Sequence, residues 1–211
     1  MGLSVSIHVL ADMLERDPEG ADWIRAQLGI VNDLLTAQGL PRHDEPERAG
    51  EVVARRNVGS FPYSFLHYLR RAFAYARRGV PVTPVARGED PVRDPMVEDV
   101  AELFDTHLIC HSDAEGFYVP VHFNEVIVDV DDRGLAGGIL GSTQRLLAEL
   151  IEVAPAIGIS LDGSQLPDAE AAKIADDDPP RPPLWTERMV WLTLHESARV
   201  SLANRTMIVF H

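Results

Sequence analysis

The chain has 211 residues, of which 45% are hydrophobic, and it carries a formal net charge of −14 at pH 7. The length favours a single domain spanning 1–211, and the apolar content excludes a disordered chain. The acidic surplus argues against direct nucleic-acid binding, which needs a basic surface, and no apolar run is long enough to predict a membrane span.

The first predicted elements are a strand and a long helix. Residues Leu3–Val9 alternate sufficiently to favour a strand, with a helix start as the alternative. The run Asp17–Glu19 is typical of a helix start, because Asp can cap, Pro fits the first turn and Glu suits the positive end of the helix dipole. Apolar residues then recur at helical spacing as far as Leu35, and Gly39–Pro41 ends the helix.

Residues 62–78 form the clearest amphipathic pattern in the chain. One helical stripe, from Phe65 to Ala76, is apolar, and the opposite side is basic. The candidate binding residues are those of the basic side: His67, Arg70, Arg71, Arg77 and Arg78. Arginine forks bind carboxylates and phosphates, so this face is suited to dock an acidic partner or the acidic segments of a second copy. The alternative is a solvated helix face.

A short helix at Met96–Phe104 is followed by a predicted β-hairpin. Its two strands are Thr106–His111 and Phe117–Phe123, which are rich in residues that favour strands. The five residues between them are typical of a turn. Val126–Val130 favours a third strand.

This hairpin holds the candidate metal ligands, which are His107, His111, Asp113 and His122. Imidazole and carboxylate are ligands that zinc accepts. In a strand, His107 and His111 share one face, whereas a simple hairpin puts His122 on the other, so three ligands meet only if a bulge intervenes. The competing interpretation is a half-exposed strand that carries histidines. We predict no cofactor, with zinc or another divalent metal as the alternative.

The region after the hairpin predicts a turn and a capped helix. Residues 134–141 are rich in glycine, and Ser142 is a suitable N-cap for a helix that continues through Val153. A loop that leads into a helix N-terminus favours anion binding in general. The phosphate-loop, dinucleotide and calcium-loop patterns are all incomplete here, so we predict a structural turn.

The C-terminal part predicts two further helices, a linker and a last strand. A weaker helix at Pro167–Ala175 precedes a linker at 176–184, where Asp and Pro are concentrated. Trp185–Ala203 predicts a helix that is buried on two faces. Thr206–His211 favours a final strand.

Glu196 falls within the apolar stripe of this last helix. The preceding His195 begins a zinc-protease helix motif, but that motif needs a second histidine at position 199, where the chain has arginine. A buried carboxylate must be paired or protonated, so we predict an ion pair between Glu196 and Arg199. A catalytic acid is the alternative.

The cysteine content and the N-terminal composition predict a soluble, cytoplasmic protein. Cys110 is the one cysteine, which permits no internal disulfide and fits a reducing compartment. Its expected role is that of a small buried hydrophobe. Residues 1–10 lack the basic residues and the long apolar core of a secretory signal.

The order of elements predicts an α+β fold, with a mainly helical domain packed on a small, largely antiparallel sheet. No nucleophile elbow or other reaction motif is present, and acidic surfaces steer association with basic partners. The sequence therefore predicts a non-catalytic, acidic protein-binding protein of the inhibitor or immunity type. Its expected partner is a protein or a second copy of the chain, with neither nucleic acid nor membrane. The alternative is a hydrolase or a metal- or small-molecule-binding enzyme with its site at the 107–122 hairpin.

Overall fold

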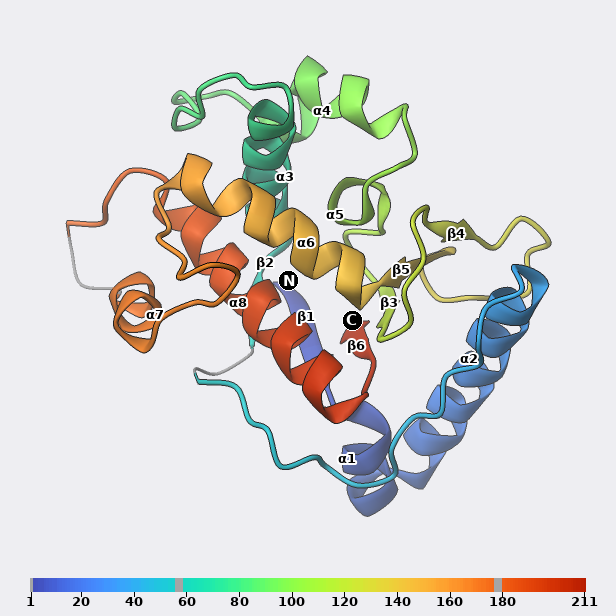
Figure 1. The fold of residues 1–211 in the computed structure, drawn as a ribbon. Coiled ribbons are helices and arrows are strands. Elements are labelled where there is room, and N and C mark those ends of the chain that lie inside the picture. Colours follow the sequence, from blue (N-terminus) through green and yellow to red (C-terminus); the bar gives the residue numbers. More distant parts are fainter. Residues whose placement is uncertain (1, 56–58, 177–179) are drawn as a thin grey trace.

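A mixed sheet lies at the centre of the molecule (Figure 1). The structure is a computed structural model, and it describes residues 2–55, 59–176 and 180–211. Six strands pair in the order β2-β1-β6-β3-β5-β4. They are β1 Gly2–Ile7, β2 Ser60–Pro62, β3 Gly116–Val119, β4 Ile127–Val128, β5 Ile139–Ser142 and β6 Ile208–Phe210. Among the described strands only β3 and β5 pair in parallel, so the predicted α+β fold is confirmed and its sheet is mixed.

Helices surround this sheet. They are α1 Val9–Arg16, α2 Pro18–Ala37, α3 Tyr63–Arg77, α4 Pro95–Ala101, α5 His107–Cys110, α6 Thr143–Val153, α7 Asp168–Ala175 and α8 Trp185–Asn204, with 3-10 turns at Pro91–Arg93 and Ala154–Ile157. Within the described ranges, none of them has both the length and the hydropathy that a membrane crossing requires.

The two faces of the sheet pack against different helices. Side chains of a strand alternate between faces, and along β3 Tyr118 enters one core while Phe117 and Val119 enter the other. The first core is filled by α3, α6 and α8, and the second by α1 and α2. The molecule therefore has three layers, with α8 and α6 crossing the face opposite to α2 (Figure 1).

The strands nearest the two chain ends lie side by side in the middle of the sheet. Strand β1 pairs antiparallel with β6, with Val5 opposite Phe210. The Ser4 amide donates a 2.8 Å hydrogen bond to the His211 carbonyl, and the His211 amide donates a 3.1 Å bond in return. Strand β6 thus joins β1 to β3.

Several predicted boundaries are confirmed, together with their capping residues. The Asp17 carboxylate accepts a hydrogen bond from the Gly20 amide at the start of α2. The Ser142 hydroxyl accepts one from the Arg145 amide at the start of α6. Of the predicted linker 176–184, residues 177–179 lie outside the described residues.

The predicted hairpin is wrong. Residues 107–110 form the short helix α5, and β3 pairs with β6 and β5 instead of with the 106–111 segment. The physical reason is a distant carboxylate: the backbone amides of His107 and Leu108 donate 2.8 and 2.7 Å hydrogen bonds to Glu149 on α6. These bonds satisfy the amides that open a helix and remove them from any strand ladder. The end of the glycine-rich run, predicted as a turn, is strand β5.

Glycine is required at position 141, where β5 approaches β3. A Cβ added to Gly141 would lie 2.3 Å from Cδ1 of Tyr118, a buried ring that is anchored because its hydroxyl donates to the His107 carbonyl. Gly141→Ala is expected to lower the free energy of unfolding by about 1–3 kcal/mol through overpacking. Gly29→Ala is the control, because a Cβ there meets no atom within 4 Å and a helical alanine is favourable. Urea denaturation of both variants measures the difference, and equal stabilities would contradict it.

Candidate functional site

The predicted basic face of α3 is partly core. Arg70 and Arg71 are each 6% exposed. Nε and Nη2 of Arg70 donate to the carbonyls of Leu108 and His111 at 2.8 and 2.5 Å. Arginine is tolerated there because carbonyl oxygens of α5 and of the residue after it, about 40 residues away, accept its hydrogen bonds. The helical pattern predicts that Arg70 and Arg71 are exposed, and for these two residues it is wrong.

Four of the five candidate binding residues, all except Arg70, bond to aspartate side chains. Arg71 bonds to Asp94 at 2.7 Å, Arg77 to Asp105 and Arg78 to Asp99, both at 2.5 Å, and the His67 ring bonds to Asp113 at 2.9 Å. These partners occupy the groups that a docking surface would need. The role of His67, Arg70, Arg71, Arg77 and Arg78 as a binding surface stays a prediction.

The four candidate metal ligands do not gather at one point. Nδ1 of His107 accepts from the Ser142 amide, and its Nε2 donates to the Asn124 carbonyl. Both ring nitrogens of His111 face backbone carbonyls. Asp113 bonds to His67, and His122 is exposed. Among the described residues, no group of three or more His, Cys, Asp or Glu is placed to hold a metal ion.

His107 and His111 are instead buried core residues. Burial lowers the pKa of each ring from 6.5 to about 4, because a charged imidazole would lose its hydration. His111 also stacks on Tyr118 with ring centroids 4.1 Å apart. The pKa of buried Glu149 is shifted in the opposite direction, because burial raises it to about 7.

The α1–α2 acidic surface comprises five exposed carboxylates: Asp12, Glu15, Asp17, Glu19 and Asp22. Among the described residues, only Asp22 of these five has an ion pair, with Arg25 at 3.6 Å. Trp23 lies beside them on α2 with 49% of its surface exposed, and its ring is 6.2 Å from that of Phe117. This surface therefore combines exposed carboxylates, most of them without an ion pair among the described residues, with a large exposed aromatic ring.

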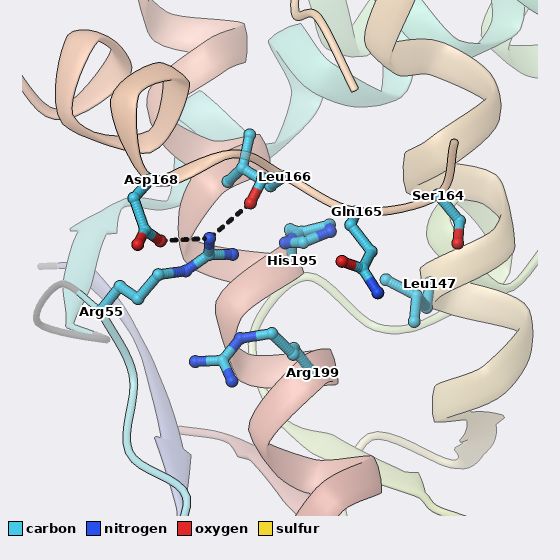
Figure 2. Close-up of a pocket in the computed structure, with 8 residues that line it drawn as sticks. All are labelled: Arg55, Leu147, Ser164, Gln165, Leu166, Asp168, His195 and Arg199. Atoms are coloured by element: carbon cyan, nitrogen blue, oxygen red, sulfur yellow. Dashed lines mark hydrogen bonds and ion pairs between the residues drawn. The ribbon is translucent and has the colours of Figure 1, made fainter. Parts of the chain in front are cut away.

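A second feature is a pocket of about 490 Å³ on the opposite side of the sheet (Figure 2). Helix α8 supplies His195 and Arg199, α6 supplies Leu147, and the segment leading into α7 supplies 164–166. Arg55 reaches the pocket from a different part of the chain and bonds to Asp168 and to the Leu166 carbonyl.

Glu196 lies behind this pocket and binds two of the arginines that line it, Arg55 and Arg199. Its side chain is 1% exposed, and its two oxygens accept hydrogen bonds from the guanidinium groups of Arg55 and Arg199. Burial raises the pKa of Glu196, but its contacts with His195, Arg199 and Arg55 outweigh that and hold it well below the usual range. The predicted ion pair with Arg199 is confirmed. Sequence reasoning missed Arg55, which is 141 residues away.

Comparison with known proteins identifies a family for this chain. A family model described as "Putative DNA-mimic protein" matches residues 1–210. No curated protein and no solved structure matches the chain.

The family match corrects the prediction about the partner and supports the prediction of an acidic protein-binding protein. The prediction that set nucleic acid aside when naming the partner is wrong, because the family is described by its mimicry of DNA, whereas a protein partner fits that description. The match agrees with an acidic protein-binding protein and gives no support to the enzyme alternative. Since the family model covers nearly the whole chain, this protein belongs to the family described as putative DNA-mimic proteins.

Proposed function

We propose that this protein occupies the DNA-binding surface of a basic protein, with the carboxylates of the α1–α2 acidic surface in the place of DNA phosphates. The observation that carries the proposal is this surface of five exposed carboxylates, four of which have no ion pair among the described residues. Proteins that bind DNA do so largely through Lys and Arg contacts to phosphates. An acidic surface presents the same charge to those contacts.

The charges extend along the surface in a way that suits a linear binding site. Duplex DNA carries one negative charge per about 1.7 Å of its axis. On α2, Glu19 and Asp22 are separated by about 4.5 Å of helix rise, and Asp33 lies about 16 Å beyond Asp22, close to the same side of the helix. Asp33 is also exposed. The exposed side of α2 thus carries carboxylates near both of its ends.

Trp23 supplies a contact that charge alone does not. Exposed tryptophans are enriched among the residues that dominate binding energy, and an indole face attracts Arg or Lys. With Glu19 and Asp22 as neighbours on the helix, Trp23 is suited to receive a cationic side chain of the partner.

The single free cysteine, Cys110, fits a reducing cytoplasm, where we propose that the protein acts.

The test is displacement by DNA. The immobilised protein is exposed to a native lysate at low salt, bound proteins are released with duplex DNA, and each released protein is purified for binding measurements. We expect a DNA-binding protein whose dissociation constant for this chain rises steeply with salt, as charge-steered association requires. A partner that stays bound in saturating duplex DNA would refute the proposal.

Two matched variants locate the contact. The first neutralises the α1–α2 acidic surface with Asp12→Asn, Glu15→Gln, Asp17→Asn, Glu19→Gln and Asp22→Asn, and Asp17→Asn keeps a side-chain oxygen that can cap α2. The control neutralises five exposed acids elsewhere with Glu102→Gln, Glu115→Gln, Glu125→Gln, Asp132→Asn and Glu152→Gln. We expect about a 100-fold loss of affinity in the first variant and less than about 3-fold in the control, because contact charges matter more than net charge. Equal losses would show that only net charge acts.

A further inference from the structure

The pocket in Figure 2 has a charge that is unusual for this chain. Arg55, Glu196 and Arg199 form a triad in which two guanidinium groups share one buried carboxylate, so the triad carries a net charge of +1. The chain as a whole carries −14. Asp168 also bonds to Arg55, but its side chain is 90% exposed, so water weakens its effect at the pocket.

Polar groups at the pocket lack internal partners. The guanidinium of Arg55 is fully engaged, since it donates hydrogen bonds to Glu196, Asp168 and the Leu166 carbonyl. Arg199 uses Nε and Nη2, and across the described ranges its Nη1 donates no hydrogen bond. The side chains of Ser164 and Gln165 likewise form no hydrogen bond with any described residue, and both are exposed at the rim.

His195 also has a ring nitrogen without a close hydrogen-bond partner in the described part of the chain. It lines the pocket at the centre of the residues drawn in Figure 2, and its side chain is 3% exposed. Its Nδ1 is buried without a hydrogen bond among the described residues, since the nearest Glu196 oxygen is 3.7 Å away. A buried polar atom without a partner is costly, which makes such atoms rare unless a ligand or water satisfies them.

We propose that this pocket binds a small organic acid with a single carboxylate. The carboxylate bonds to Nη1 of Arg199 beside His195, a short apolar segment packs on Leu147 and Leu166, and a polar end bonds to Gln165 and Ser164. A volume of about 490 Å³ suits such a molecule. The site is independent of the proposed DNA mimicry, because α6 and α8 cover the opposite face of the sheet from α1 and α2.

The charge balance favours a carboxylate over a phosphate. A monoanion matches the net +1 of the Arg55, Glu196 and Arg199 triad, whereas a phosphate dianion would leave excess negative charge near Glu196 and Asp168. With respect to the described residues, Nη1 is the one guanidinium nitrogen of Arg199 without a hydrogen bond, so two phosphate oxygens cannot be bound through two of its nitrogens in the bidentate manner.

The experiment is isothermal titration calorimetry on the full chain with a set of monocarboxylates that includes 4-hydroxybutyrate and 4-hydroxybenzoate. 4-Hydroxybenzamide is the uncharged counterpart, and inorganic phosphate is the competing anion. We expect saturable one-to-one binding of at least one carboxylate, about tenfold or more weaker binding of the amide, and weaker binding of phosphate. Backbone amide NMR shifts should change in 164–166 and 195–199.

Variants separate a ligand site from an incidental hollow. Gln165→Ala removes an exposed side chain without internal bonds and should weaken carboxylate binding about threefold. Arg199→Gln should weaken it about tenfold or more, while Arg133→Gln, at an exposed arginine on another surface, should not change it. Melting temperatures confirm that each variant is folded. No saturable carboxylate binding, an amide or phosphate that binds as tightly, or an unchanged affinity in Arg199→Gln would each overturn the proposal.

Discussion

Replacing Glu196 with glutamine is expected to lower the free energy of unfolding by about 3–5 kcal/mol, the cost of breaking a buried ion pair by removing one partner. Glu196 is 1% exposed, and both of its oxygens accept hydrogen bonds from Arg55 and Arg199. Glutamine keeps one acceptor, removes the charge and turns an amide group toward two guanidinium groups. Arg199 then loses its carboxylate partner, and among the described residues Arg55 keeps only the exposed Asp168.

The measurement is urea denaturation at pH 7, with Glu152→Gln as the control. Glu152 is exposed and has no ion pair among the described residues, so that change should stay within about 0.5 kcal/mol. A further variant, Glu196→Leu with Arg55→Met and Arg199→Met, removes the whole triad and should recover much of the loss, because no charge remains unpaired. If Glu196→Gln were as stable as the natural chain, the triad would not hold the 51–55 segment against α8.

Acidification from pH 7 to pH 4 is expected to remove several kcal/mol of stability through His107 and His111. Each ring has its pKa lowered from 6.5 to about 4 by burial, with Arg70 close to His111 and with Arg145 and His122 close to His107. A lowered pKa means that the unfolded chain binds the proton more readily. The stabilising contribution is therefore complete above pH 6.5 and is lost as the pH falls to 4, at about 3 kcal/mol for each histidine.

Glu149 changes the stability in the opposite direction over much of the same pH range. Its pKa is raised from 4.5 to about 7, so its contribution is present below pH 4.5 and is lost as the pH rises to 7. Stability should still rise toward neutral pH, because two histidines oppose one carboxyl group. Urea denaturation between pH 4 and pH 8 checks this. His107→Gln should remove about half of the acid-side slope, and Glu149→Gln should steepen it. A flat profile would contradict the prediction.

Elements set by local sequence were predictable. The α2 helix follows from the Asp17 cap and its apolar spacing, and α6 from the Ser142 cap, because these signals lie within a few residues of the bonds that they form. Elements set by distant groups were not. The α5 helix depends on Glu149, about 40 residues away, and nothing in the 106–111 segment indicates it.

The same distinction explains the candidate sites. A helical pattern describes Arg70 only as basic, because the carbonyl groups that accept its hydrogen bonds lie in α5 and just after it, and the pattern does not give the position of that segment. Glu196 was predictable as a paired carboxylate because Arg199 is one turn away. Arg55 and the pocket around it depend on a contact across 141 residues, and no local signal marks it. The acidic surplus was visible in the composition, but its placement on α1 and α2 required the fold.

The pairing of β1 with β6 has a consequence for how the chain acquires its structure. The strand that joins β1 to β3 is made of residues 208–210, so the sheet remains in two separate parts, β2-β1 and β3-β5-β4, until those residues are available. Closing a loop of about 200 residues costs entropy before the contacts it forms can compensate. Proteins dominated by such long-range pairing fold slowly. On the ribosome, helices such as α2 can form early, while the central sheet is completed only after β6 has left the exit tunnel.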